Sequence, residues 1–246
     1  LKKLGCALHA NRKSLCAPCP ERDRQFRYLQ RQRRRFAKEQ APIISVDTKK
    51  RELIGRFKNP GRVWSRTPVE VHDHDFPSLA EGVAIPYGVY DLQANRGRVN
   101  VGTSRNTPTF AAESIGQWWR REGRQRYPHA SRLLILADNG GSNGADTYLW
   151  KHALQEKLAD RFGLFVTVCH YPTGASKWNP IEHRLFSEIS KRWAGHPLVD
   201  YSTVLYLIRD THTSTGLTVS CSLDHRNYPK GIKLTPAQLS QISLSR

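Results

Sequence analysis

Two acidic residues directly follow apolar runs that are predicted to be strands, and both could act as metal ligands. Asp138 follows the apolar run 133–137, which is typical of a strand buried on both faces, and precedes the glycine-rich turn 139–144. Asp47 directly follows a second apolar strand, 43–46, and a buried carboxylate needs a cation, a metal or a hydrogen-bond network. For Asp138 the alternative is that it only caps its turn.

A third acid, Glu182, falls in the first turn of a helix predicted from Pro180 onward. Its alternative role is local, because Asn179 as N-cap and Glu182 at the third helical position resemble a capping box. If the three acids meet instead, their carboxylates can hold two Mg²⁺ ions about 4 Å apart. Such a pair, in which Mn²⁺ can replace Mg²⁺, activates a water or a 3′-hydroxyl for in-line phosphoryl transfer.

The elements around these acids predict a mixed sheet with flanking helices. The segment 48–55 is expected to continue the Asp47 strand into a hairpin that ends at the turn 59–61. Trp118 and Trp119 are expected in the core rather than on a base-stacking platform. The other predicted elements are strands at 87–92, 98–101 and 164–170 and helices at 107–123, 148–162 and 201–208.

The charge of the chain indicates a polyanionic partner. Lys and Arg number 39 against 21 acids, which gives a net charge of +18 and a pI near 10.1. Nucleic acid is the first candidate and an acidic membrane surface the second. There is no run of about 18 apolar residues and no signal peptide, so we expect a cytoplasmic protein that does not enter the membrane.

Basic residues cluster in two places. Residues 1–40 carry 12 Lys or Arg against 3 acids, and a helix predicted over 21–40 presents a band of arginines that includes Arg31, Arg34 and Arg35. That band is either a phosphate-contacting face or a solvated helix face. Near the acids, the candidates for positioning phosphates are Lys49, Lys50, Lys177 and Arg184, with solvated charges as the alternative.

Two other groups of residues could bind metal. Cys6, His9, Cys16 and Cys19 offer four zinc ligands, but the spacing between the pairs is short for a zinc ribbon, and incidental cysteines are the preferred interpretation. The segment His72–Asp75 has alternating His and Asp, but neighbours in an extended segment point to opposite faces. We therefore interpret it as a polar loop.

The sequence resembles bacterial insertion-sequence transposases with a DDE catalytic domain, and most closely the Rhodopirellula-type DDE transposase family. The matching stretches cover nearly the whole chain and include ISVDTKKRELIG at 44–55, HDF at 74–76, IPYGVYDL at 85–92, ESIGQWWR at 113–120, ADNGGSNG at 137–144, TVCHYPTGASKWNPIEHRLFS at 167–187 and YPKGIK at 228–233. The resemblance implies a ribonuclease-H-like fold with Asp47, Asp138 and Glu182 as metal ligands and catalytic residues.

The resemblance also implies the organisation and the activity. We expect a basic helical segment at 1–40, left from or linked to a missing DNA-binding region, a ribonuclease-H-like core at 41–196, and a C-terminal extension at 197–246 packed on that core. The implied function is metal-dependent DNA cleavage and strand transfer at insertion-sequence ends. The alternatives are an inactive DNA-binding remnant of a truncated transposase and a cellular nuclease of the same fold.

The expected partners follow from that function. The partners are the DNA of the element ends and the DNA of the target. We also expect a homo-oligomer in the DNA complex and a location in the bacterial cytoplasm, associated with the nucleoid. Family members carry an upstream helix-turn-helix region, and this chain is expected to begin just after it and to end before the family's C-terminus.

Overall fold

The computed structural model describes residue 10 and residues 19–244. Six strands form one mixed sheet in the order β6-β5-β1-β3-β4-β7. The short strand β2 pairs with the first three residues of β3. The strands are β1 (Ile43–Thr48), β2 (Glu52–Ile54), β3 (Gly82–Asp91), β4 (Arg96–Gly102), β5 (Arg132–Ala137), β6 (Phe165–His170) and β7 (Thr218–Asp224).

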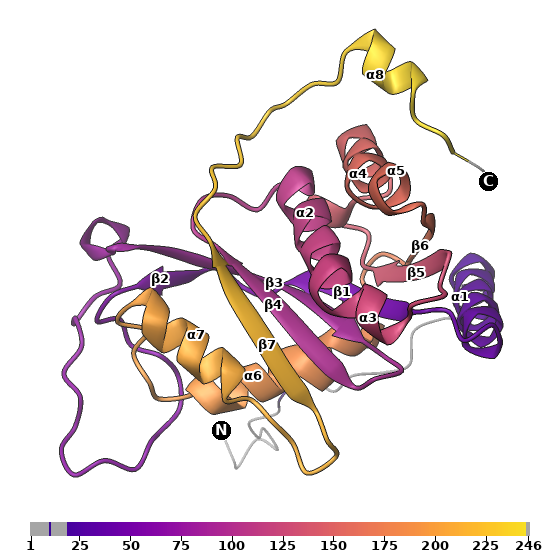
Figure 1. Cartoon of the computed structure of the whole chain (residues 1–246). Coiled ribbons are helices and arrows are strands. Elements are labelled where there is room, and N and C mark those ends of the chain that lie inside the picture. Colours follow the sequence, from indigo (N-terminus) through magenta and orange to yellow (C-terminus); the bar gives the residue numbers. More distant parts are fainter. Residues whose placement is uncertain (1–9, 11–18, 245–246) are drawn as a thin grey trace, which may run out of the picture.

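Helices cover both faces of this sheet (Figure 1). The helices are α1 (Pro20–Lys38), α2 (Pro108–Trp118), α3 (Arg124–Arg126), α4 (Tyr148–Leu154), α5 (Asp160–Phe162), α6 (Ser187–Trp193), α7 (Tyr201–Arg209) and α8 (Pro236–Ser240). Short 3₁₀ helices lie at Pro77–Leu79, Gly141–Asn143 and Ser176–Trp178, and π turns at Trp119–Gly123, Gln155–Ala159 and Glu182–Phe186.

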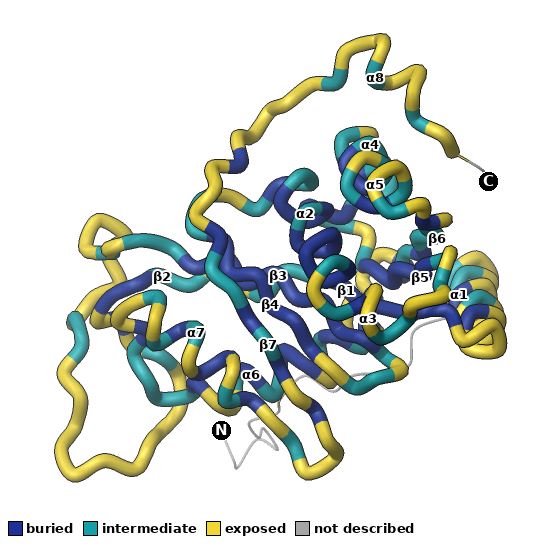
Figure 2. The backbone as a smooth tube through the Cα atoms, viewed as in Figure 1, coloured by how far each residue is buried: buried dark blue, intermediate teal, exposed yellow. Residues whose placement is uncertain are grey.

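The strand pattern decides which side chains face which helices. Ile44 and Val46 of β1 pack with α2 and α4 in one core, whereas Ile43 packs with α1 on the other face. Because side chains alternate across a strand, successive residues of the central apolar strands pack into the cores on opposite faces of the sheet. The α6 and α7 helices share the second face with α1 and cover β3, β4 and β7. The sheet is therefore buried on both sides (Figure 2).

Most of the predicted elements form where the sequence places them. The helix at 148–162 is observed as α4, a π turn and α5, and Gly163 ends it with φ 67°. Trp118 and Trp119 are 1% and 4% exposed, which confirms that they belong to the core. The mixed sheet with flanking helices is confirmed as well.

Two local predictions were wrong, and one strand was missed. β2 pairs with β3 rather than with β1, so no hairpin joins the Asp47 strand to the turn 59–61. β4 begins at Arg96 rather than Arg98, because the β3–β4 turn lies at residues 92–95. The strand β7 was not predicted at all, and it lies parallel to β4 at the edge of the main sheet.

Candidate active site

Two of the three acids sit at the same edge of the sheet on neighbouring strands. β1 and β5 are parallel, and Val46 of β1 is level with Ala137 of β5. Asp47 and Asp138 each follow one member of this pair, so they are side by side at the carboxyl ends of two adjacent strands, which are spaced about 4.8 Å apart. The apolar runs before each acid create this arrangement, because they form the two central buried strands.

The helix that carries Glu182 is tied to β1 by a buried pair of polar side chains. The Ser45 hydroxyl donates to Oδ1 of Asn179, which is fully buried, and Nδ2 of Asn179 donates to the Val46 carbonyl at 3.3 Å. The Ser45 hydroxyl also accepts the backbone N–H of Ile181 at 3.1 Å. We call this contact the Ser45–Asn179 latch.

The latch shows that the capping-box interpretation of Glu182 was wrong. The Asn179 side chain hydrogen-bonds β1 rather than its own helix. The backbone N–H of Ile181, in the first turn of that helix, is accepted by the Ser45 hydroxyl instead. The Glu182 side chain interacts with Asp47 through charge and a hydrogen bond. Residues 182–186 form a π turn, a widened turn that is frequent at functional sites.

A glycine opposite Asp47 allows the helix to come this close. Gly88 of β3 is paired with Asp47, and a Cβ atom there would lie 2.6 Å from the Phe186 ring and 2.8 Å from Ile181. Real Cβ atoms do not approach that closely, so a larger residue at 88 would push away the turn that carries Glu182.

Asp47 lies within electrostatic reach of both other acids. Burial raises the pKa of Asp47 to about 8, together with the charges of Asp138 and Glu182, against a backbone hydrogen bond from Thr48. Burial also raises the pKa of Asp138, and the charge of His170 lowers it in part. Asp47 is the central member, in electrostatic contact with both other acids.

The polar surroundings of Asp138 leave one of its oxygens unused. Oδ1 of Asp138 is buried and has no hydrogen-bond partner among the described residues. Beside it, the fully buried Tyr87 donates its hydroxyl to Oδ1 of Asn143 at 2.9 Å, and Nε2 of His170 contacts the Asn143 carbonyl at 2.7 Å. These contacts hold the glycine-rich turn in place but do not satisfy the acid.

The donor atoms suit a hard divalent cation. Asp47, Asp138 and Glu182 offer only carboxylate oxygens, which Mg²⁺ and Mn²⁺ prefer, and the unpartnered Asp138 oxygen is the kind of atom that such an ion satisfies. In the described part of the chain, no three His, Cys, Asp or Glu residues surround one point closely enough to ligate an ion.

The predicted phosphate-binding residues divide between two ends of the sheet. Burial lowers the pKa of Lys49, and the charges of Glu52 and Glu182 counteract this, which places Lys49 beside the acids. Lys50 is exposed next to it, and Nζ of Lys177 lies 3.9 Å from the centre of the Trp178 ring. Arg184 instead hydrogen-bonds Tyr90, whose hydroxyl reaches Asn95 at the β3–β4 turn.

Arg184 therefore points toward the end of the sheet opposite Asp47, because β3 runs antiparallel to β1. The predicted arginine band lies on α1. There Arg31 packs over the Tyr28 ring and Arg35 pairs with Glu39 at 3.0 Å. Arg34 is exposed and lines a shallow pocket with Ile43 and Leu92 at the start of β1.

The two alternative metal groups do not form sites in the described part of the chain. In the loop at 72–75, Nδ1 of His74 pairs with the Asp73 carboxylate at 3.1 Å, and both side chains are mostly exposed. Cys6, His9 and Cys16 lie outside the described residues, and Cys19 is an exposed free thiol. Among residues 10 and 19–244, no helix is both long and apolar enough to cross a membrane.

Several solved structures of the Mos1 transposase have a similar fold. The Mos1 strand transfer complex matches with a TM-score of 0.51 and 16% identity, over 82% of this chain and 57% of that chain. A pre-cleavage Mos1 transpososome matches with a TM-score of 0.50 and 13% identity, over 82% and 58%. At such low identity the likeness concerns the fold, and it confirms the predicted ribonuclease-H-like architecture.

Comparison with protein families is more specific. A search of curated proteins gave no significant match. The family described as "Rhodopirellula transposase DDE domain" matches residues 1–246, the whole of the sequence, and this confirms the resemblance noted from the motifs. The chain therefore belongs to the Rhodopirellula transposase DDE domain family.

Proposed function

We propose that this chain is the catalytic part of a DNA transposase that cuts DNA at insertion-sequence ends and joins the released end to a target. The proposal rests on the position of Asp47 beside Asp138 at two adjacent strand ends, with Glu182 in electrostatic contact with Asp47, in a member of a DDE transposase family. The net charge of +18 supports DNA as the substrate.

Asp47, Asp138 and Glu182 would together hold divalent cations, two Mg²⁺ or Mn²⁺ ions in our proposal. Bound there, the ions would lower the pKa of the attacking water or hydroxyl and neutralise the leaving oxygen. In cleavage, a water oxygen forms the new bond to phosphorus and the 3′-oxygen leaves with a proton. In strand transfer, that 3′-hydroxyl attacks a target phosphodiester, and the target 3′-oxygen leaves.

The chain's own residues prepare the site for this chemistry. With no cation nearby, burial and the charges of the two neighbouring acids raise the pKa of Asp47 to about 8, which favours its protonated form. The Ser45–Asn179 latch fixes the helix that bears Glu182 to the strand that bears Asp47, and it acts as a positioning contact. The residues predicted to contact phosphates near the acids are Lys49, Lys50 and Lys177. A homo-oligomer would bring two DNA ends together.

The test compares wild type with Asp138→Asn on labelled duplexes that carry the inverted repeats flanking the gene. We expect Mg²⁺- or Mn²⁺-dependent nicking by wild type and a rate at least about 10²–10³-fold lower in the variant, a loss typical of removing one charge-stabilising group. Asp75→Asn, in the exposed loop, is the matched control and should keep the wild-type rate. Equal nicking by wild type and Asp138→Asn would contradict the proposal.

A further inference from the structure

A cleft beside Asp47 is lined by three segments that lie far apart in the sequence. The turn after β1, the loop before α2 and the tail after β7 form its walls, and it has a volume of about 650 Å³. We call it the basic cleft, and its lining residues are Thr48, Lys49, Arg51, Ile85, Ser104, Arg105, Asn106, Asn227 and Lys230.

The positive charge of the basic cleft is not neutralised by the chain. Four lining residues are cationic and none is acidic. In the part of the chain that the structure describes, Arg51, Arg105 and Lys230 are exposed and form no ion pair, whereas Lys49 pairs with the Glu52 carboxylate at 3.9 Å and packs over the Trp193 ring at 4.3 Å. A set of like charges converging from three segments repels itself, so it is favoured only when an anion occupies the space between them.

The basic cleft opens next to the candidate catalytic acids. Thr48 directly follows Asp47, and its hydroxyl donates to Oδ1 of Asn106 at 3.2 Å, which joins the first wall to the second. Lys49, at the same wall, is within electrostatic reach of Glu182. A polyanion lying in the basic cleft would therefore pass directly beside the acids.

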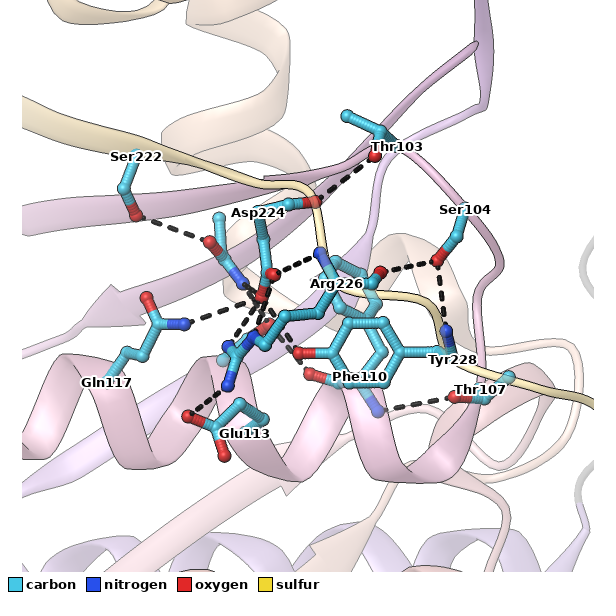
Figure 3. A network of polar contacts seen from close by, with 12 residues as sticks. Thr103, Ser104, Thr107, Phe110, Glu113, Gln117, Ser222, Asp224, Arg226 and Tyr228 are labelled. Carbon is cyan, nitrogen blue, oxygen red and sulfur yellow. Dashed lines mark hydrogen bonds and ion pairs between the residues drawn. The ribbon is translucent and has the colours of Figure 1, made fainter. Parts of the chain in front are cut away.

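The third wall is held by a buried polar network (Figure 3). The Asp224 carboxylate, 3% exposed, accepts from Arg226 at 2.6 Å, Tyr228 at 2.8 Å and Asn100 at 3.1 Å. The Arg226 guanidinium also pairs with Glu113 of α2 at 3.1 Å. This network, which we call the Asp224 network, fixes the start of the tail to β4 and α2.

The Asp224 network also fixes the tail to the second wall. The Ser104 hydroxyl donates to the Arg226 carbonyl at 2.9 Å and accepts the backbone N–H of Tyr228 at 3.2 Å. Asn227 lies between these two anchored residues, and Lys230 follows two positions after Tyr228. These contacts give the start of the tail a defined position against β4, α2 and the second wall.

We propose that the basic cleft binds the phosphodiester backbone of the DNA strand that enters the catalytic site. The inference rests on the proposed function and adds Arg51, Arg105 and Lys230 to the DNA contacts. Lysine and arginine bind phosphates without reading base sequence. The basic cleft therefore supplies affinity and strand position, and it does not select a sequence.

The test is the salt dependence of DNA binding by the full chain in EDTA, where no cleavage interferes. The variant is the double substitution Arg105→Gln and Lys230→Gln, at two exposed side chains that make no hydrogen bond within the described chain. Each lost phosphate contact should lower the slope of log K against log salt by about 0.9, so the slope should fall by about 2. At 0.1 M salt this corresponds to a loss of affinity of at least roughly tenfold.

Two further variants make the result decisive. Arg121→Gln with Arg124→Gln removes the same charge from exposed residues near the opposite end of the sheet and should change the slope much less. Arg105→Lys with Lys230→Arg keeps the charges and should restore the wild-type slope. Thermal melting of each variant confirms that it is folded.

The proposal is overturned if the first variant keeps the wild-type slope, or if the Arg121 and Arg124 pair lowers the slope as much. Its failure is separate from failure of the proposed function, because binding in EDTA needs no metal and no chemistry. If the chain nicks DNA in a way that depends on Asp138 but binds DNA independently of Arg105 and Lys230, only the proposal for the basic cleft is refuted.

Discussion

Two aspartates near strand ends of the same sheet, the buried Asp224 and the half-buried Asp47, have opposite surroundings. Asp224, the last residue of β7, receives hydrogen bonds from Arg226, Tyr228 and Asn100. Burial alone would raise its pKa, but these bonds lower the pKa of Asp224 well below its usual value. Asp47, near the end of β1, receives one backbone N–H at 2.7 Å and faces two further acids, and its pKa is raised to about 8.

The difference separates a structural acid from one that we propose to be functional. The chain supplies the positive charge and the donors that Asp224 needs, and it does the same for the fully buried Asp91, which binds Arg126 at 2.9 Å and the Tyr127 hydroxyl at 2.9 Å. It supplies no comparable partner to Asp47 or Asp138 among the described residues. The positive charge for these acids must come from a ligand, which is the role we propose for divalent cations.

The largest expected effect is on stability. Asp224→Asn removes the anion from a buried, charge-assisted network and should lower the free energy of unfolding by about 3 kcal/mol. Asp138→Asn, in metal-free buffer, should change it by less than about 1 kcal/mol and in the stabilising direction, because it removes an unpaired buried charge. Urea unfolding of both variants measures the difference, and equal destabilisation would remove the distinction between the two acids.

The next effect concerns how the acids are brought together. Asn179→Ala breaks the Ser45–Asn179 latch and should lower metal-dependent nicking by about 10- to 100-fold, because small displacements of a positioned group are costly to catalysis. The matched control is Asn59→Ala, which breaks a 3.0 Å bond from Nδ2 of Asn59 to the Trp193 carbonyl at the far end of the same helix. If both variants lost activity equally, the latch would have no special role.

The smallest effect is a pH dependence. The folded pKa of Asp224 lies below its unfolded value near 3.8, so its contribution to stability is complete above that value and is lost as the pH falls through the folded pKa. Between about pH 5 and pH 2, wild type should therefore lose more unfolding free energy than Asp224→Asn, by at most about 1.4 kcal/mol per pH unit. If the unfolding free energies of wild type and Asp224→Asn changed in parallel with pH, the depressed pKa of Asp224 would be contradicted.

The parts of the fold that could be predicted from sequence are those encoded locally. The apolar runs before Asp47 and Asp138 are continuous because both faces of β1 and β5 are covered, and that signal needs no knowledge of the rest of the chain. The apolar face of α4 and the Trp118–Trp119 pair could also be predicted from the local sequence alone. The mixed sheet followed from the order of these elements.

The parts that were missed depend on contacts between distant segments. In β7, Ser220 and Ser222 alternate with apolar residues because both serines bond Arg98 of β4, which no local pattern reveals. Ser45 caps a helix 136 positions away, so Asn179 was taken for the cap. Arg184 is two positions after Glu182, about 200° around the helix, and this rotation turns it from the acids toward Tyr90.

The most direct test of the central claim is whether divalent cations bind through the three acids. Thermal melting with increasing Mg²⁺ or Mn²⁺ measures this without any reaction, because an ion that binds only the folded chain stabilises it by about 2.7 kcal/mol at a hundredfold excess over Kd. We expect wild type and Asp75→Asn to be stabilised equally and Asp138→Asn to show little or no stabilisation. Equal stabilisation of Asp138→Asn would contradict the account.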